Sequence, residues 1–272
     1  MSFVDNGPAM LFCPGNRPDR FGKARERSDT VILDLEDAVG PEEKDAAREM
    51  VAGALADLGS AAMVRVNAVG SPWHDDDLRM ARASGAATVM VPKVQHRSDL
   101  DHLDGVSVLV ICETARGVLR AEQILEHPNC VGVLWGGEDL TADLGGTTSR
   151  SQLGTYHGVV GLARHMTLLA AAAAGKIAVD AVHVDIPDLT GLRRESLEAV
   201  EMGFQAKACI HPSHVPVIRQ SFTPSAEDVT WARGVLKAAA SAGSAVFSYG
   251  GRMIDEPLLR HARRIETAST NK

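Results

Sequence analysis

Short apolar runs recur along this chain, and each ends in a charged or strongly polar residue. A buried strand of a parallel sheet is a run of about four to eight apolar residues, and a helix-like stretch follows each run. Because parallel strands deliver their carboxyl ends to one rim, the pattern predicts that distant side chains meet there. Five runs show it best: Ile32–Asp37, Met63–Asn67, Val89–Lys93, Val108–Glu113 and Val133–Asp139.

Eight strands are expected in all, which is the number that a (β/α)8 barrel needs. The other three are Met10–Cys13, Ala178–Ile186 and Ala206–His211. The pattern changes after Pro212, when eight strands are already complete. We therefore predict an α/β TIM barrel as the catalytic domain over residues 1–220, and a C-terminal helical lid extension over residues 221–272.

Helix signals lie between the expected strands. Pro41, followed by two glutamates, opens one helix, and Asp188 caps another that runs to Met202. An Ala-rich helix is expected from about Gln152 to Ala174, after a loop that extends over the rim, and a further helix from about Ser225 to Ala242.

Charge and composition exclude several classes of protein. The formal net charge is −7 and the basic residues are scattered, which argues against a nucleic-acid partner. Met1–Pro8 lacks the features of a signal peptide, and the longest apolar stretch, Leu168–Ala174, is too short for a membrane span, so we expect a cytoplasmic protein without a membrane partner. Buried free thiols are expected at all four cysteines, which lack C-x-x-C spacing: Cys13, Cys112, Cys130 and Cys209.

Two carboxylates end consecutive expected strands. Glu113 and Asp139 are separated by about one β-α repeat, so neighbouring strands would hold them side by side at the rim. Two acidic ligands, with water and substrate oxygens in the other positions, suit Mg²⁺. An acid/base pair and a structural salt bridge are the alternatives that spacing leaves open.

A cation ends the third expected strand. Arg65 has the same parity as Met63 and Asn67 and should face the barrel interior. There a guanidinium beside a divalent ion could bind the carboxylate of an α-keto or α-hydroxy acid. Pairing with Asp34 or Glu36 is an equally good interpretation. Glu36 could instead orient metal-bound water, whereas Asp37 should face away. Lys93 breaks the parity of its strand, and its role stays open.

A basic turn follows the first expected strand. Arg17, Arg20 and Lys23 lie close to a predicted helix start, where amide groups and cations together favour phosphate, as in a nucleotide or coenzyme A. A solvated basic turn is the more common explanation. Among the histidines, His211 and His214 are expected to form hydrogen bonds at the start of a helix, and His183 could add a polar contact at the mouth of the barrel.

Several motifs in order resemble the citrate lyase β-subunit-like family. That family stands with the malyl-CoA and citramalyl-CoA lyases among the HpcH/HpaI aldolases, and the similarity covers nearly the whole chain. The matching segments are Leu11–Gly15, Arg17–Phe21, Ile32–Val39, Arg65–Asn67, Val91–Lys93, Glu113–Gly117, Gly136–Leu140, Cys209–Pro212 and Gly251–Asp255.

The resemblance implies roles for particular residues. Mg²⁺ would be held by Glu113 and Asp139, and Arg65 would bind the keto-acid carboxylate, with Glu36 and Gly137 beside it. Phosphate or pantetheine contacts would come from the segment that runs from Arg17 to Lys23. The C-terminal lid would pack on an adjacent protomer of a homotrimer or hexamer and bring Asp255 there to shuttle a proton.

The implied activity is Mg²⁺-dependent cleavage of a 3-hydroxyacyl-CoA thioester, such as citramalyl-CoA or malyl-CoA, into an acyl-CoA and a small α-keto acid. A synthase-type condensation that hydrolyses the thioester is one alternative. A coenzyme A-independent aldolase is another, although such aldolases usually carry a histidine where this chain has Asp37. A non-autonomous subunit of a citrate lyase complex is the third.

Overall fold

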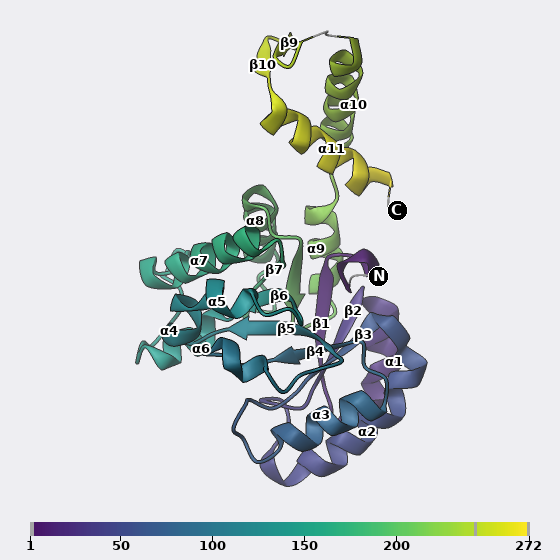
Figure 1. The fold of residues 1–272 in the computed structure, drawn as a ribbon, viewed down its shortest axis with the longest axis vertical. Helices are drawn as coiled ribbons and strands as arrows, with labels where there is room; N and C mark the ends of the chain where they lie inside the picture. Colours follow the sequence, from purple (N-terminus) through teal and green to yellow (C-terminus); the bar gives the residue numbers. More distant parts are fainter. Residues whose placement is uncertain (1–2, 242–243, 271–272) are drawn as a thin grey trace. The chain divides into compact units, whose positions relative to one another are not determined.

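Eight parallel strands close into a barrel in the order of the sequence, which confirms the predicted fold class. The computed structural model describes residues 3–241 and 244–270 (Figure 1). Closure is made by β1 and β8, where Ala9 pairs with Lys207. The strands are β1 Ala9–Pro14, β2 Thr30–Asp34, β3 Ala62–Arg65, β4 Thr88–Val91, β5 Ser107–Cys112, β6 Cys130–Trp135, β7 Ile177–Asp180 and β8 Ala206–Cys209.

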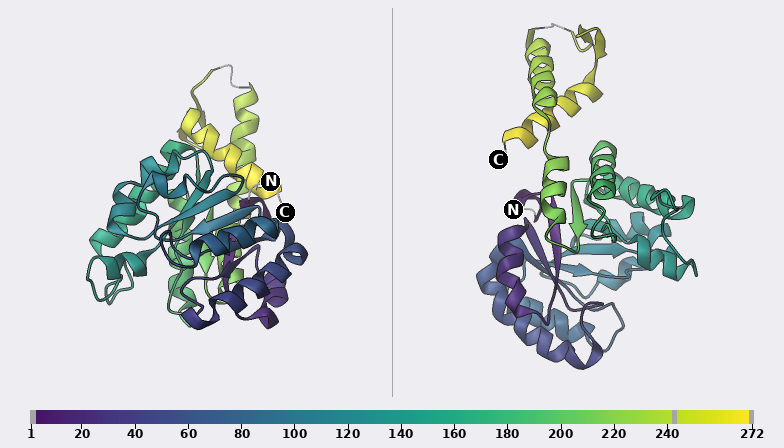
Figure 2. Two further views of the ribbon diagram at one scale, coloured as in Figure 1. Left: turned by 60° about the horizontal axis from the view of Figure 1, so that its bottom comes forward. Right: turned by 180° about the vertical axis from the view of Figure 1, so that it is seen from behind.

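Helices surround the strands of the barrel (Figures 1 and 2). Those between the strands are α1 Pro18–Arg27, α2 Lys44–Leu58, α3 His74–Ala83, α4 Ala115–Leu119, α5 Ala121–Leu125, α6 Gly137–Asp143, α7 Gly158–Ala174 and α8 Leu189–Met202. Short 3-10 turns are η1 Phe3–Asn6, η2 Pro41–Glu43, η3 Gly59–Ala61 and η4 Arg97–Leu100. As predicted, the Asp188 side chain caps α8, because it accepts a hydrogen bond from the amide of Gly191 at 2.8 Å.

Three predicted boundaries were wrong. Pro41 opens a 3-10 turn, and α2 begins only at Lys44. The Ala-rich helix α7 starts at Gly158 instead of Gln152, because the preceding residues form a loop in which Arg150 and Tyr156 pair as an antiparallel bridge. The seventh strand ends at Asp180, and the residues after it are irregular.

The barrel interior is filled by inward-facing apolar side chains from successive strands. Met10, Ile32, Met63, Met90 and Leu109 are fully or almost fully buried in one cluster. They alternate along their strands with residues that face the helices, as the two-residue period of a strand requires. The filled interior leaves space for a site only at the ends of the strands.

The chain from Gln220 onward forms a second compact unit. It begins within the last turn of α9, His214–Phe222. It then contains helix α10, Ala226–Ser241, a hairpin of β9, Phe247–Tyr249, and β10, Arg252–Ile254, and helix α11, Glu256–Thr270. Its own apolar cluster joins α10 to α11 and β10 through Ala232, Val235, Ile254, Leu259, Ala262 and Ile265. Ala242, the expected end of α10, lies outside the described residues.

Two further expectations concern single features of the chain. All four cysteines are buried and free, as predicted. Within the described ranges, none of the helices has both the length and the apolar character that crossing a membrane would require.

Candidate active site

A cavity of about 420 Å³ lies at the carboxyl ends of the strands. Asp34 from the end of β2, Arg65 from β3, Glu113 after β5 and Asp139 from α6 all line it. Phe12, Ile111, Leu134, Trp135, Val182 and Ile210 supply its apolar wall. The prediction that distant polar residues meet at one rim is therefore confirmed.

Arg65 is held in place by acidic neighbours. Its Nε and Nη2 donate to the two oxygens of Asp34, each at 2.7 Å, and its Nη1 lies 2.8 Å from Oε2 of Glu36. The guanidinium also lies over the Phe12 ring. Burial lowers the Arg65 pKa, but the bond to Asp34 and the nearby carboxylates outweigh burial and raise it, so Arg65 stays cationic.

Asp34 thus takes the paired hydrogen bonds that we expected a bound carboxylate to receive. An arginine has five N–H donors, and Asp34 accepts from two of them, on Nε and Nη2. The other three lie on Nη1 and Nη2. Arg65 is therefore a preorganised cation at the cavity wall, with one Nη2 hydrogen that Asp34 does not take and an Nη1 that Glu36 and Asp37 contact.

Lys93, which the sequence left without a role, contacts three carboxylates at the site. Its backbone has φ of 54°, the one positive φ at a non-glycine position in the described chain, which turns it out of the strand direction after Pro92. Its Nζ lies 2.6 Å from Glu36, 3.4 Å from Asp37 and 3.6 Å from Asp139. Burial lowers its pKa, but the bond to Glu36 and the nearby acidic charges raise it overall.

Glu113 is buried beside the cavity, and the Lys93 amide donates to its Oε1 at 2.9 Å. Burial, followed by the charges of Asp139 and Glu36, raises the Glu113 pKa to about 8. Gly136 lies against this side chain, since a Cβ built at Gly136 would stand 2.7 Å from Oε2 of Glu113. The site therefore holds a carboxylate whose ionised form needs a compensating positive charge.

The charge cluster around Arg65 and Lys93 shows what could supply that positive charge. It contains five carboxylates and two cations, a formal excess of three negative charges: Asp34, Glu36, Asp37, Glu113 and Asp139 against Arg65 and Lys93. An anionic substrate would be repelled by such a cluster unless a cation joined it. Oxygen donors with negative charge suit Mg²⁺, and Glu113 and Asp139 present such donors at the cavity wall.

Two orientation predictions were wrong. Asp37, expected to face away, lines the cavity, and its oxygens lie 3.4 Å from both Arg65 and Lys93. Asn67, expected on the same face as Arg65, instead binds Lys44 and Asp77 beyond the end of β3. Both residues follow the last residue of their strand, where alternation no longer determines direction.

Several expected site residues are not among those that line the cavity. Arg17 pairs with Asp19 at the surface, and Arg20 and Lys23 are exposed on α1, so their phosphate contacts stay a prediction. Asp255 belongs to the second unit, where its Oδ1 accepts a hydrogen bond from the Leu258 amide at 3.4 Å. Its catalytic role also stays a prediction.

The histidines expected near the mouth serve local structure. His183 is buried with its Nδ1 3.1 Å from Glu195. The Nδ1 of His211 accepts from the Ser213 amide, as expected at a helix entry, and the Nε2 of His214 lies 3.2 Å from the Ile186 carbonyl.

Gly137 and Tyr156 complete one side of the cavity. Tyr156 packs edge-on against Trp135, whose Nε1 donates to the fully buried Asp180 at 2.8 Å. Asp180 also accepts from Arg164 and Lys207, which fixes the indole from behind. The sequence reasoning missed Tyr156, because its loop was expected to be helical.

Two family models match the chain. The HpcH/HpaI aldolase/citrate lyase family matches residues 8–212, and a carbon–carbon bond lyase family of the TIM-barrel fold matches residues 156–270. Citrate lyase subunit beta-like protein of Mycobacterium tuberculosis H37Rv is 43% identical over 94% of this chain and 93% of its own length.

Two more curated relatives are less similar. Human mitochondrial citramalyl-CoA lyase is 32% identical over 97% of this chain and 85% of its own length. A (3S)-malyl-CoA thioesterase of Cereibacter sphaeroides is 33% identical over 94% of this chain and 92% of its own length.

Solved structures carry ligands that bear on the site. CitE of M. tuberculosis in complex with magnesium, acetoacetate and coenzyme A has a TM-score of 0.90 and 41% identity, covering 97% of this chain and 98% of that one. The same protein with magnesium and pyruvate has a TM-score of 0.81 and 38% identity, covering 95% of this chain and 97% of that one. Mg²⁺ is thus bound in solved proteins similar to this one.

Proposed function

We propose, from the premise that this chain belongs to the HpcH/HpaI aldolase/citrate lyase family, that it is a Mg²⁺-dependent carbon–carbon lyase that acts on coenzyme A thioesters. Its substrate would be a 3-hydroxyacyl-CoA, which it cleaves into an acyl-CoA and an α-keto acid. The observation that carries this proposal is that Arg65, Glu113 and Asp139 line one cavity. Magnesium, keto acids and coenzyme A in the similar CitE structures support it.

Glu113 and Asp139 would hold Mg²⁺, which when bound supplies a Lewis acid that lowers the pKa of the substrate hydroxyl. Arg65 would orient the substrate carboxylate through the Nη2 hydrogen that Asp34 does not take, together with Nη1, which the substrate would share with Glu36 and Asp37. Because Asp34 fixes the guanidinium, little side-chain entropy is lost when the carboxylate binds.

The bond that breaks joins the hydroxyl carbon to the α-carbon of the thioester. A base removes the hydroxyl proton, the keto acid leaves, and the electron pair passes to the thioester as an enolate, which is then protonated to the acyl-CoA. Glu36 is not among the residues of the cavity wall and is held by Arg65 and Lys93, so we assign it the positioning of these two cations.

The base itself would be Asp255 from an adjacent protomer of a homotrimer or hexamer. A mixing experiment tests this assignment directly. Glu113→Gln and Asp255→Asn chains should each be inactive alone. A shared site is intact only where an Asp255→Asn chain supplies the barrel and a Glu113→Gln chain supplies the lid, which random assembly of equal amounts gives in about one quarter of the sites. The mixed oligomers should therefore regain about one quarter of full activity. No recovery in proven mixed oligomers would contradict the shared site.

The remainder of the coenzyme A would extend past the end of β1. There Arg17, Arg20 and Lys23 present three cations at the surface of α1, suited to phosphate. Replacing Arg20 and Lys23 with Gln should raise KM for the thioester and leave kcat nearly unchanged.

Product analysis tests the activity. The protein is incubated with Mg²⁺ and citramalyl-CoA or malyl-CoA, and the keto acid, acyl-CoA and free coenzyme A are measured. A lyase releases keto acid and acyl-CoA in equal amounts without a free thiol, and activity on free thioesters excludes dependence on an acyl-carrier subunit. Arg65→Gln should abolish turnover, whereas the exposed control Arg79→Gln should keep it.

Thioester hydrolysis is the second candidate, because one relative is named a malyl-CoA thioesterase. Free coenzyme A would then appear together with the hydroxy acid. Neither set of products from any thioester tested would end both proposals.

A further inference from the structure

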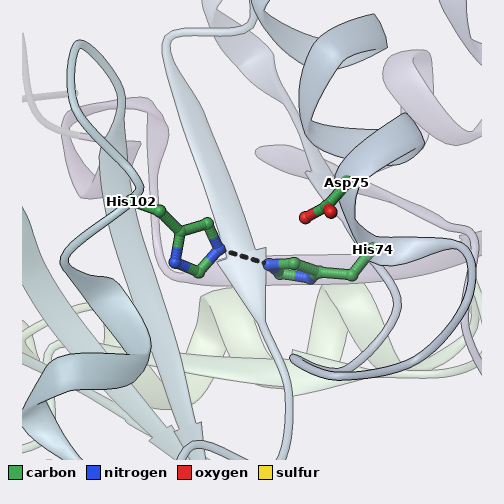
Figure 3. Close-up of side chains that lie close together, drawn as sticks. All are labelled: His74, Asp75 and His102. Atoms are coloured by element: carbon green, nitrogen blue, oxygen red, sulfur yellow. Dashed lines mark hydrogen bonds between the residues drawn. The ribbon is translucent and has the colours of Figure 1, made fainter.

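A second group of metal-ligating side chains lies outside the cavity wall. His74, Asp75 and His102 each place one possible ligand atom within 4.8 Å of the others (Figure 3). His74 and Asp75 open α3, and His102 lies in the segment between η4 and β5. None of the three lines the cavity of the candidate active site.

His74 is oriented as metal-bound histidines usually are. The residue is almost fully buried, and its Nδ1 lies 2.7 Å from the Asn67 carbonyl oxygen. A carbonyl oxygen can only accept, so Nδ1 carries the hydrogen and donates it. The lone pair of the neutral ring is therefore on Nε2, and a carbonyl behind the ring fixes it in that tautomer.

The Nε2 of His102 faces this lone pair. The two Nε2 atoms are 2.8 Å apart, and the ring planes cross at 68° (Figure 3). Two nitrogens bound to one tetrahedral zinc ion at about 2.0–2.1 Å are roughly 3.4 Å apart, so the gap has to widen by roughly half an ångström. His102 is exposed and can make that movement, while Asp75, also exposed, adds a carboxylate oxygen and leaves room for water.

We infer that His74, His102 and Asp75 form a binding site for a divalent transition-metal ion of the Zn²⁺ class, distinct from the magnesium site. Imidazole nitrogens favour Zn²⁺, Ni²⁺ and Cu²⁺, whereas Mg²⁺ takes oxygen ligands. Without metal, His102 Nε2 donates to His74 Nε2. Metal binding replaces this hydrogen bond, and the His102 proton moves to Nδ1.

The site would tie α3 to the framework behind the active site. Asn67, whose carbonyl orients His74, donates its side-chain amide to the Leu35 carbonyl and accepts from Lys44. Lys44 also donates to the carbonyl of Glu36 at 2.7 Å. A metal ion here would therefore brace the backbone that carries the acidic end of β2, and its role would be structural.

Metal titration of the full chain tests the inference. Chelator-treated protein is kept in excess Mg²⁺, so that the oxygen site is occupied, and is titrated with Zn²⁺ in a calorimeter. We expect one Zn²⁺ per chain, an affinity at least about tenfold weaker in His102→Ala and in Asp75→Asn, and no change in His165→Ala, an exposed histidine on α7. Titration with Co²⁺ should give the visible spectrum of a nitrogen-ligated ion in wild type but not in His102→Ala.

Loss of Zn²⁺ binding in these variants can be distinguished from unfolding. Because His102 and Asp75 are exposed, their variants should have the melting temperature of the wild type when no metal is present. Wild-type protein that binds no Zn²⁺ in excess Mg²⁺ would overturn the inference. So would Zn²⁺ binding that survives in His102→Ala and is lost in Glu113→Gln, because the ion would then sit in the cavity.

Discussion

Gly136→Ala should damage the proposed magnesium site through a single added methyl group. Gly136 has φ of −121° and ψ of 108°, which alanine adopts without backbone strain. The new Cβ would stand 2.7 Å from both Cβ and Oε2 of Glu113, closer than non-bonded atoms approach. Glu113 cannot easily turn away, because the Lys93 amide donates to its Oε1.

The size of the effect follows from the overlap. Adding a methyl group to a well-packed site costs about 1–3 kcal/mol. If the cost is met by displacement of the Glu113 carboxylate, the affinity for Mg²⁺ should fall by about 5- to 150-fold, since 1.4 kcal/mol corresponds to a factor of ten. Activity should fall with it and recover in part at high Mg²⁺.

Calorimetric titration with Mg²⁺ and thermal melting measure this prediction. Gly53→Ala is the matched control, because its Cβ meets nothing within 4 Å on an exposed face of α2. It should keep the metal affinity and gain slightly in stability. A folded Gly136→Ala protein with wild-type affinity for Mg²⁺ would show that Glu113 is not a ligand.

Three more predictions concern charge. Lys93→Met removes the ammonium that Glu36 contacts, so the free energy of unfolding in urea should fall by about 1–3 kcal/mol, and equal stability would refute the pairing. Burial raises the Glu195 pKa, but interactions with His183, Lys207 and Arg150 outweigh burial and lower the pKa to about 2 from 4.5. Its stabilisation of about 3 kcal/mol should be lost as the pH falls from 4.5 to 2 in wild type but not in Glu195→Gln, with exposed Glu201→Gln behaving like wild type. Burial raises the Glu113 pKa from 4.5 to about 8, so the metal-free fold loses stability as the pH rises from 4.5 to 8, because the unfolded chain ionises there first. The increase in Tm on adding Mg²⁺ should therefore grow from pH 6 to 9 and vanish in Glu113→Gln.

The fold could be predicted because most barrel strands are buried on both faces and therefore appear as apolar runs, although the buried Lys207 interrupts β8. The same regularity located Arg65, Glu113 and Asp139, since each lies at or just past the carboxyl end of its strand. The second unit lacks such runs, and only its helix α10 was expected with nearly its observed bounds.

The wrong predictions concern residues just beyond the strand ends, where the two-residue alternation of a strand no longer applies. Asp37 was placed by continuing the alternation of β2, but that strand ends at Asp34, so the extrapolation had no structural basis. Lys93 adopts a left-handed backbone that no pattern of apolar residues encodes. Tyr156 lies in a loop whose Gly and Ser residues should have weighed against a helix.

These irregular residues are also where the structure stores free energy. A lysine in the left-handed region costs of order 1 kcal/mol, and a carboxyl group with a pKa near 8 resists ionisation at neutral pH. The turn at Lys93 directs its backbone amide to Glu113 and its ammonium to Glu36, so one strained residue connects the proposed metal ligand to the carboxylate that positions Arg65. If Glu113 binds Mg²⁺ as proposed, part of the binding free energy of the ion would go into ionising this carboxyl group. The site would then have a lower metal affinity, but its charge cluster would admit an anionic substrate only when the cation is present.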